Sequence, residues 1–408
     1  MHSTQDQLRA RRFLDRRSPP NIFTLIALSS LSGIALNIFL PSLPNMTAYF
    51  ETEYGIMQMA VAFYLAMNAV LQLIIGPISD RYGRRPVLLG GLIVFLLATL
   101  GCIWATNVWM FLAFRMLQAA VVVTMALARA TIRDMVPERE AASMIGYVTM
   151  GMAVAPMLGP AIGGALDAAF GWQASFWFLF AMGALVLALT WADLGETAPR
   201  RAGGFIQQMR DSPELFRSPR FWGYASTLGL SSGAFFAYLG GGPYVGDRVF
   251  GMDPATFGIY FGAPAVGYFL GNFLSGRYSI RFGVNHMVLV GSVVCAAGIT
   301  LNLMLFAVGL GSPIAFFGLM SLMGLGNGMV IPNATAGALS VRPHLAGTAS
   351  GLSGALMIGL GAALSAVAGV VLNLGLGALP LLVLMVLSAY GAILSILYVI
   401  GRESRLGT

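Results

Sequence analysis

Twelve apolar runs of about 20 residues follow one another along this 408-residue chain, and they leave few folds open to it. A helix of that length crosses the roughly 30 Å hydrocarbon core of a bilayer and satisfies its own backbone there. Only 10% of the residues are charged, whereas a soluble domain has roughly 25%. The sequence therefore predicts an all-α polytopic membrane protein with twelve transmembrane helices. The runs cover 21–43, 56–78, 86–106, 108–130, 141–166 and 172–193, then 221–244, 256–279, 286–308, 312–337, 345–372 and 378–400.

The basic residues predict which way the helices run. All 23 are arginine, and 21 of them lie in the two tails or near the segments after the even-numbered runs, including Arg129 at the end of the fourth run. Arg248 lies on the other side, and Arg115 falls inside a run. Arginine accumulates in cytoplasmic segments, so we expect both termini to be cytoplasmic in the cell inner (plasma) membrane. The net charge of +7 is then a topology and lipid-headgroup signal, and no nucleic-acid partner is expected.

One long linker breaks the apolar pattern and divides the chain into two halves. Residues 194–220 carry five arginines and separate six apolar runs from six. We expect a basic cytoplasmic tail at 1–20, an N-terminal six-helix bundle at 21–193, a cytoplasmic linker at 194–220, a C-terminal six-helix bundle at 221–400 and a cytoplasmic tail at 401–408. The linker is either a solvated tether or contains a short amphipathic surface helix around 204–216. The sequence leaves both readings open.

A short charged loop between the second and third runs occurs twice. Residues 76–86 read GPISDRYGRRP, and part of this pattern returns 200 residues later. A repeat at about half the chain length indicates a duplicated fold, so the two bundles should be pseudo-symmetric. Ile280 stands where the first copy has Asp80. The shared positions are Gly76 and Gly276, Ser79 and Ser279, Arg81 and Arg281, Gly83 and Gly283, Leu89 and Leu289, and Gly91 and Gly291.

This loop resembles motif A of the major facilitator superfamily, which lies at the same place between the second and third helices. The resemblance implies the major facilitator fold, alternating access and a cytoplasmic gate. In the family the acid, here Asp80, meets the N-terminus of the eleventh helix, here near 344–350; such an alignment is worth about 0.3–1 kcal/mol. Arg129 and Arg133 are alternative partners for Asp80. The gate residues implied here are Gly76, Asp80, Arg81, Gly83, Arg84 and Arg85.

The fifth run contains prolines and glycines that would break a soluble helix. Gly159 and Gly163 are four residues apart, a spacing that lets a neighbouring membrane helix pack closely. In this position the run resembles motif C, the antiporter signature of drug-exporting facilitators, and this resemblance implies export. The residues that match are Gly151, Pro156, Gly159, Pro160, Gly163 and Gly164.

Arg115 lies about seven residues into the fourth run, where an arginine costs about 2.5 kcal/mol or more, so we expect it to be functional. Arg115 and Gln118 resemble the Arg-x-x-Gln of the family's motif B, in which the arginine faces the cavity and influences a protonatable group. Residues 37–44, NIFLPSLP, resemble a stretch of the Bcr/CflA drug-resistance subfamily, with Asn37 in place of its aspartate.

The usual carboxylate for proton coupling is therefore missing. All 16 acids lie at or beyond the ends of the runs. Coupling through an acid at the rim near Arg115 and coupling by a different route both remain open. We assign Asn37, Arg115 and Gln118 to the coupling region.

These features predict a secondary active transporter that exports drugs or other small amphipathic compounds by proton-coupled antiport. Its partners would be a small-molecule substrate, the proton and the lipid bilayer, and it would act as a monomer. The alternatives are an exporter of a specific metabolite, such as an amino acid or siderophore, and a transport-dead membrane receptor. The three histidines lie near loops, so neither an enzyme, a cofactor nor a metal site is expected. The substrate cavity should lie between the halves and include Phe39, Met150, Phe235, Tyr238, Tyr268, Asn327 and Asn333.

Overall fold

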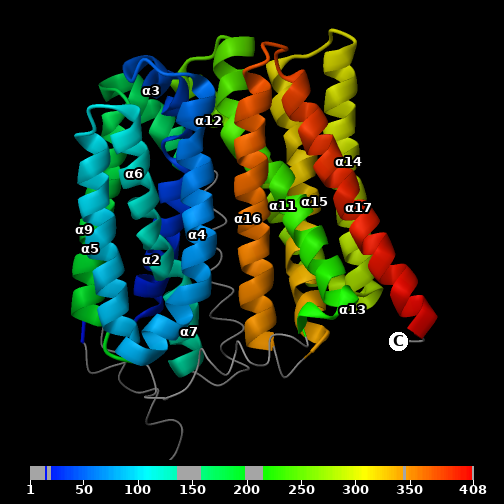
Figure 1. Cartoon of the computed structure of the whole chain (residues 1–408), viewed down its shortest axis with the longest axis horizontal. Coiled ribbons are helices and arrows are strands. Elements are labelled where there is room, and N and C mark those ends of the chain that lie inside the picture. Colours follow the sequence, from blue (N-terminus) through cyan, green and yellow to red (C-terminus); the bar gives the residue numbers. More distant parts are fainter. Residues whose placement is uncertain (1–13, 16–19, 136–157, 198–214, 343–345, 407–408) are drawn as a thin grey trace, which may run out of the picture.

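The structure is a computed structural model that describes residues 14–15, 20–135, 158–197, 215–342 and 346–406 (Figure 1). In this part of the chain every regular element is helical. Ten helical segments there are long and apolar enough to cross a bilayer, the first being Ile22–Tyr49 and the last Leu379–Ser404. The prediction of an all-α polytopic membrane protein is confirmed.

The helices of the first half follow the predicted runs, but two runs contain breaks. The first is divided at Leu40, where Pro41 cannot donate a backbone hydrogen bond to the helix. The fourth contains a short 3₁₀ segment after Gln118. The fifth predicted run, 141–166, is described only from Leu158 onward. The elements are α2 (Ile22–Asn37), η1 (Leu40–Ser42), α3 (Leu43–Tyr49), α4 (Tyr54–Tyr82), α5 (Arg84–Ile103), α6 (Val108–Gln118), η2 (Ala119–Val121), α7 (Val122–Met135), the helix Leu158–Phe170 and α9 (Gln173–Asp193).

The second half contains the other six predicted runs. The eighth run of the chain, 256–279, is divided at Gly262, and Pro264 lies in the first turn of the helix that follows. The elements are α11 (Pro219–Tyr244), the π-helical η3 (Val245–Val249), α12 (Pro254–Phe261), α13 (Ala263–Phe282), α14 (Val284–Ala307), α15 (Pro313–Ser340), α16 (Ala346–Leu372) and α17 (Leu379–Leu406).

The two halves stand side by side with their long helices roughly aligned (Figure 1). We call the end where α4 turns into α5 and α13 turns into α14 the basic end, because Arg81, Arg84, Arg85, Arg277 and Arg281 lie there. The C-terminus lies at this end, whereas α3 and α12 lie at the opposite end. Across the boundary, α4 of the first half packs against α16 of the second.

The buried apolar core is shared between the halves only in part. One cluster combines side chains of both halves, such as Phe39 and Phe111 with Tyr238 and Phe316. A second cluster, which includes Leu25 at the start of α2, contains side chains of the first half alone. A third, around Phe221, Tyr224 and Val399, contains side chains of the second half alone. The halves therefore share a core toward the opposite end and have separate cores toward the basic end.

Candidate functional site

The two copies of the repeated loop form the same backbone turn. Gly83 ends α4 with a φ of +97°, and Gly283 ends α13 with a φ of +80°. Each glycine N–H donates to the carbonyl of the serine four residues earlier, Ser79 or Ser279, at 2.9 Å. Side chains rarely adopt this region of φ, which explains why both copies keep a glycine there. The duplicated turn predicted from the sequence is present.

In the first copy, acids from two later segments hold the turn. Arg84 is only 9% exposed, and its guanidinium binds Ser79 and lies 3.1 Å from the carboxylate of Asp134 on α7. Glu196 accepts the backbone N–H groups of Arg84 and Arg85 at 2.8 and 3.3 Å. A carboxylate in this place satisfies free N–H groups and complements the helix dipole of α5.

The gate contact expected for Asp80 stays a prediction. The side chain of Asp80 lies outside the described part of the structure, as do those of Arg129 and Arg133 and the segment 343–345. Gly76 lies within α4, and the exposed Arg81 places its guanidinium near the ring of Tyr82.

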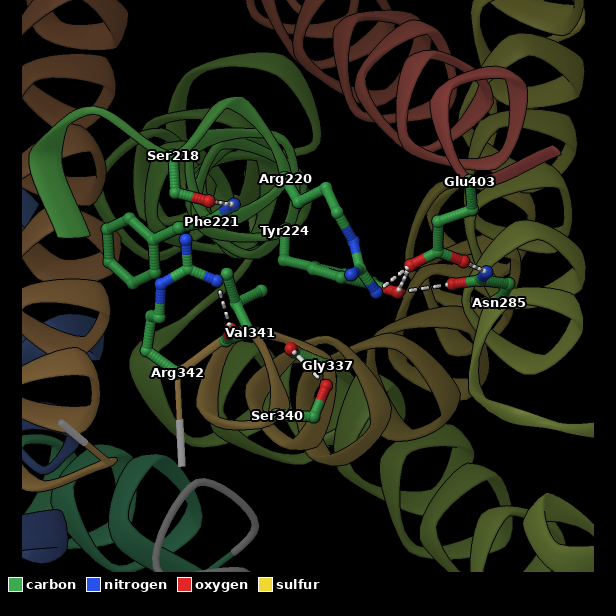
Figure 2. Close-up of polar contacts among 10 residues, drawn as sticks. All are labelled: Ser218, Arg220, Phe221, Tyr224, Asn285, Gly337, Ser340, Val341, Arg342 and Glu403. Carbon is green, nitrogen blue, oxygen red and sulfur yellow. Dashed lines mark hydrogen bonds and ion pairs between the residues drawn. The ribbon is translucent and has the colours of Figure 1, made fainter. Parts of the chain in front are cut away.

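In the second copy, a single acid at the end of the chain replaces these contacts (Figure 2). Glu403 on α17 binds Arg220 of α11 at 2.5 Å and accepts the side-chain amide of Asn285 on α14 at 2.5 Å. The hydroxyl of Tyr224 lies 2.6 Å from the Asn285 amide oxygen and 3.1 Å from Glu403. The sequence reasoning missed this cluster; its available signal was that Glu403 is the only acid after Asp253.

The glycines of the fifth run bring three helices into close backbone contact. A β-carbon on Gly163 would overlap the carbonyl oxygen of Ile38 at the end of α2, and one on Gly159 would lie 3.1 Å from the β-carbon of Asn37. A β-carbon on Gly164 would overlap the carbonyl oxygen of Pro254 on α12, in the second half. The helix Leu158–Phe170 therefore packs both within its own half and across the boundary.

The remaining motif residues of this run divide between described and undescribed parts. The carbonyl of Pro160 faces Gly258 of α12 so closely that a β-carbon there would overlap it. Gly151, Pro156 and the predicted cavity residue Met150 lie outside the described residues.

Tyr54 and Gln58, which the sequence reasoning missed, join the halves at the opposite end. The Tyr54 hydroxyl donates to the carbonyl of Gly240 at 2.8 Å and accepts the N–H of Tyr244 at 3.1 Å. Gln58, fully buried, donates to the Ser365 carbonyl of α16 at 2.5 Å. A polar amide inside an apolar run was the signal for Gln58.

Glycines of the second half make room for Gln58. A β-carbon on Gly240 would overlap the Gln58 amide, and one on Gly369 would lie 2.8 Å from its oxygen. The side chain of Gln58 on α4 thus fits between α11 and α16. Separation of the halves at this end would break these contacts.

Arg115 is fully buried and is surrounded by neutral groups. Its guanidinium donates to the side-chain oxygen of Gln118 and, at 2.9 Å, to the carbonyl of Ala35. The rings of Phe39 and Tyr64 lie on it, each 4.2 Å from the guanidinium carbon. A cation–π contact contributes roughly 0.5–2 kcal/mol. In the described part of the chain no carboxylate forms an ion pair with Arg115.

Asn37 and Gln118, the other two coupling residues predicted from the sequence, are both buried. Gln118 donates to the hydroxyl of Thr99 at 2.8 Å, so it links Arg115 to α5. Asn37 is 2% exposed, donates to the carbonyl of Gly33 at 2.7 Å and lies against Gly159. Arg115 contacts α2 at the carbonyl of Ala35 and the ring of Phe39 just beyond the end of α2. Asn37 lies between these two positions in the sequence, but its own contacts are with Gly33 and Gly159.

The residues proposed for the substrate cavity have packing partners in the second half. Tyr238 is stacked on Phe261 with ring centroids 4.6 Å apart and donates its hydroxyl to the Phe261 carbonyl. Asn327 accepts from Ser231 at 2.6 Å. Phe235 and Tyr268 are half-buried, and Asn333 donates to Ser275 at 2.7 Å. Their role in a cavity stays a prediction.

Comparison with known proteins agrees with this architecture. The family model described as Major Facilitator Superfamily matches residues 25–366. The chain is 31% identical over 376 residues to "Multidrug resistance protein D" of Escherichia coli (strain K12), which covers 88% of this chain and 91% of that protein. It is 29% identical over 320 residues to "Chloramphenicol resistance protein" of Pseudomonas aeruginosa, covering 78% and 76%.

A solved structure shares the fold. The crystal structure of a bacterial homologue of the human lysosomal transporter Spinster, in an inward-facing and unoccupied conformation, matches with a TM-score of 0.66 and 17% identity over 93% of this chain and 94% of that one. The family match, the relatives and the fold lead to one conclusion: the chain belongs to the major facilitator superfamily, among homologues named for multidrug and chloramphenicol resistance.

Proposed function

We propose that the chain exports drugs or similar small amphipathic compounds across the inner membrane by alternating access, driven by proton entry. The names of its relatives, for multidrug and chloramphenicol resistance, support a drug substrate. The glycine-rich fifth run supports export. The distribution of arginine supports a basic end in the cytoplasm and an opposite end that faces outward, with both termini inside.

The observation that carries the proposal is the unequal packing of the two halves. They share an apolar core and the Tyr54 and Gln58 hydrogen bonds at the opposite end, and they have separate cores at the basic end. In the proposed orientation this arrangement is closed to the outside. Transport would require the Tyr54–Gln58 contacts to break and the halves to close at the basic end instead.

For proton coupling we propose Asp167, an acid at the rim of the fifth run. It is 6% exposed and accepts a hydrogen bond from Asn45 of α3 at 2.8 Å. It lies one turn beyond Gly163 and Gly164, the residues that contact α2 and α12. Separation of α12 from this helix would change its surroundings, so its proton affinity can respond to the conformational change.

Accumulation of chloramphenicol in cells tests the export proposal. Cells that overproduce the protein should accumulate several-fold less drug than cells with an empty vector, and a protonophore should abolish the difference. Arg115→Ala should also abolish it, while Arg248→Ala, which removes an exposed arginine, should not. Equal accumulation in both cell lines would refute export; export that a protonophore leaves unchanged would refute proton coupling.

A second comparison tests Asp167. Asp167→Asn should remove the dependence of export on external pH, because an amide cannot exchange a proton. Asp247→Asn is the matched control, since Asp247 is another rim acid but pairs with Arg248 at 3.2 Å on the surface. A normal pH dependence in Asp167→Asn would assign coupling to another group.

A further inference from the structure

A permanent positive charge lies in the interior of the membrane-spanning region, and in the described part of the chain no carboxylate forms an ion pair with it. Arg115 is 0% exposed, and an arginine stays protonated in proteins. Its contacts are an amide oxygen, a backbone carbonyl and two aromatic faces. These groups solvate the charge, but none of them cancels it.

Three other charged side chains are buried, Arg84, Asp167 and Asp193, but each lies at the end of a span, where it contacts Asp134, Asn45 or Thr24. Between the ends of the spans, the other buried polar groups of the described residues are neutral. They are amides and hydroxyls, for example Gln58, Asn68, Ser231, Asn327 and Asn333. By sequence, the acids lie at or beyond the ends of the apolar runs, including those of the residues that the structure does not describe. Asn37, an amide, occupies the buried position at the end of α2. Away from the ends of the spans, the interior therefore carries a net charge of +1, that of Arg115.

Two neighbouring donor groups beside this charge have no hydrogen-bond partner among the described residues. They are the Nε of Arg115 and the hydroxyl of Tyr64, whose ring lies on the guanidinium. A guanidinium N–H can only donate, and a hydroxyl can donate as well as accept. Buried polar atoms normally have a hydrogen-bond partner. Two neighbouring donors without one therefore point to a bound compound with acceptor oxygens.

We infer that the site around Arg115 and Tyr64 selects substrates by charge: it takes neutral or anionic amphipathic compounds with acceptor oxygens and excludes lipophilic cations. This inference rests on the proposed transport function and names the substrate class of that site. An uncompensated charge acts over long distances in a medium of low dielectric constant. A cation about 10 Å from Arg115, at an effective dielectric constant of about 20, would bind roughly tenfold more weakly than an equal neutral compound, and an anion roughly tenfold more tightly.

Two ions of nearly equal size and shape make the direct test. Binding of tetraphenylphosphonium and tetraphenylborate to the purified protein in detergent is measured by equilibrium dialysis, with protein-free micelles as the blank. The anion should bind at least tenfold more tightly than the cation. Arg115→Gln should bring the two affinities close together, and Arg248→Gln, which removes an exposed arginine, should leave the ratio as it is.

A gain of function tests the inference without removing Arg115. Asn37→Asp should add a negative charge to the interior and increase tetraphenylphosphonium binding at least tenfold, whereas Asn37→Ser, which is uncharged, should not. Thermal unfolding of each variant by size-exclusion chromatography shows that it is folded. Chloramphenicol export by the wild-type protein is measured in parallel.

The outcomes separate the two proposals. If chloramphenicol is exported and tetraphenylphosphonium binds as tightly as tetraphenylborate, charge selection is wrong and the transport proposal stands. If the anion is preferred in binding but no compound is exported, the transport proposal is wrong and the charge of the site stands. An unchanged ratio in a folded Arg115→Gln variant would also overturn the inference.

Discussion

The two copies of the repeated loop share a backbone turn but are held in place by different charges. Gly83 and Gly283 end their helices with the same hydrogen bond and similar φ. In the first copy the arginine after the turn, Arg84, is buried against Asp134, and Glu196 caps α5. In the second copy Val284 replaces this arginine. After duplication the turn geometry stayed and the electrostatic contacts changed.

The second copy makes its charged contact from other helices. Glu403 at the end of α17 joins Arg220 and Tyr224 of α11 to Asn285 of α14 (Figure 2). Both copies thus connect the start of a third helix to an acid that follows or ends the sixth helix of the same half. The basic end of each half is tied within that half, as the proposed alternating access of two rigid halves would require.

Glycine contacts also differ between the halves. In the first half, Gly163 packs against Ile38 of α2. In the second half the closest contacts join α13 and α15, where β-carbons on Gly267 and Gly324 would overlap the carbonyls of Ser321 and Pro264. Small residues let membrane helices approach closely, and each half uses them at a different pair of helices.

The largest effect is expected from Gly163→Ala. The added β-carbon would overlap a backbone carbonyl, which cannot move away without displacing α2. We expect a loss of several kcal/mol, enough to prevent accumulation of folded protein. Gly359 lies in α16, in the other half; a β-carbon there meets nothing within 4 Å, so Gly359→Ala should be tolerated. Yield and thermal unfolding in detergent measure both; equal yields would show that the fifth span does not pack as described.

The second prediction compares the two acids. Glu403→Ala leaves Arg220, Tyr224 and Asn285 without their common partner in a half-buried cluster, which should cost about 2–3 kcal/mol. Glu196→Ala removes an exposed helix cap and should cost about 1 kcal/mol. The midpoints of thermal unfolding should fall in that order. The reverse order would mean that the first copy of the loop depends more on its acid than the second.

The third prediction concerns the turns themselves. Gly83→Ala and Gly283→Ala should each cost about 1–3 kcal/mol, because both force a side chain into a left-handed φ. Gly83→Ala should cost more, since its β-carbon would also displace the Glu196 carboxylate, whereas Gly283 meets nothing within 4 Å. In a Glu196→Ala background the two costs should become equal. A difference that persists there would assign it to another contact.

The smallest effect is expected where the halves differ in a helix cap. Asp253 accepts the N–H groups of Ala255 and Thr256 at the start of α12, whereas Glu53, 200 residues earlier, makes no such cap at the start of α4. Asp253→Ala should cost about 1 kcal/mol and Glu53→Ala less. Thermal unfolding of the two variants at pH 7 measures the difference, and equal midpoints would contradict it.

The cap at Asp253 should also depend on pH in a defined direction. Hydrogen bonds from Thr256 and Ala255 lower the pKa of Asp253. Its contribution to stability is therefore present above the pKa of about 3.9 in the unfolded chain and is lost as the pH falls through the lower folded value. The difference between wild type and Asp253→Ala should shrink as the pH falls below about 3.9. If the stability difference between the two proteins grew as the pH fell, the pKa of Asp253 would not be lowered on folding, and the prediction would be wrong.

Much of the fold follows from the sequence because bilayer length and backbone satisfaction leave little choice. The apolar runs predict the helices, and the repeat at Gly83 and Gly283 predicts two similar turns. The helix breaks at Leu40 and Gly262 were not predicted, since proline and glycine occur inside other spans without ending a helix. Propensity alone does not decide where a membrane helix bends.

The site is less predictable from the sequence because its contacts cross between distant segments. The position of Arg115 inside a run indicates its importance, but its sandwich between Phe39 and Tyr64 depends on how three helices pack. Likewise, Gln58 gains its role only from glycines about 180 and 310 residues away. Resemblance to known motifs indicates the site residues in the first half of the chain, and the second half of the chain lacks comparable motifs.

Distances between spin labels at four equivalent positions test alternating access most directly. Glu53 and Asp253 are exposed at the opposite end, and Arg81 and Arg281 are exposed at the basic end, one of each pair in each half. Pairs of cysteines at 53 and 253 and at 81 and 281, in a protein with Cys102 and Cys295 replaced by serine, are measured by double electron–electron resonance with and without chloramphenicol. We predict reciprocal changes: conditions that lengthen the first distance shorten the second. Two distances that stay fixed, or that change in the same direction, under every condition would contradict the account.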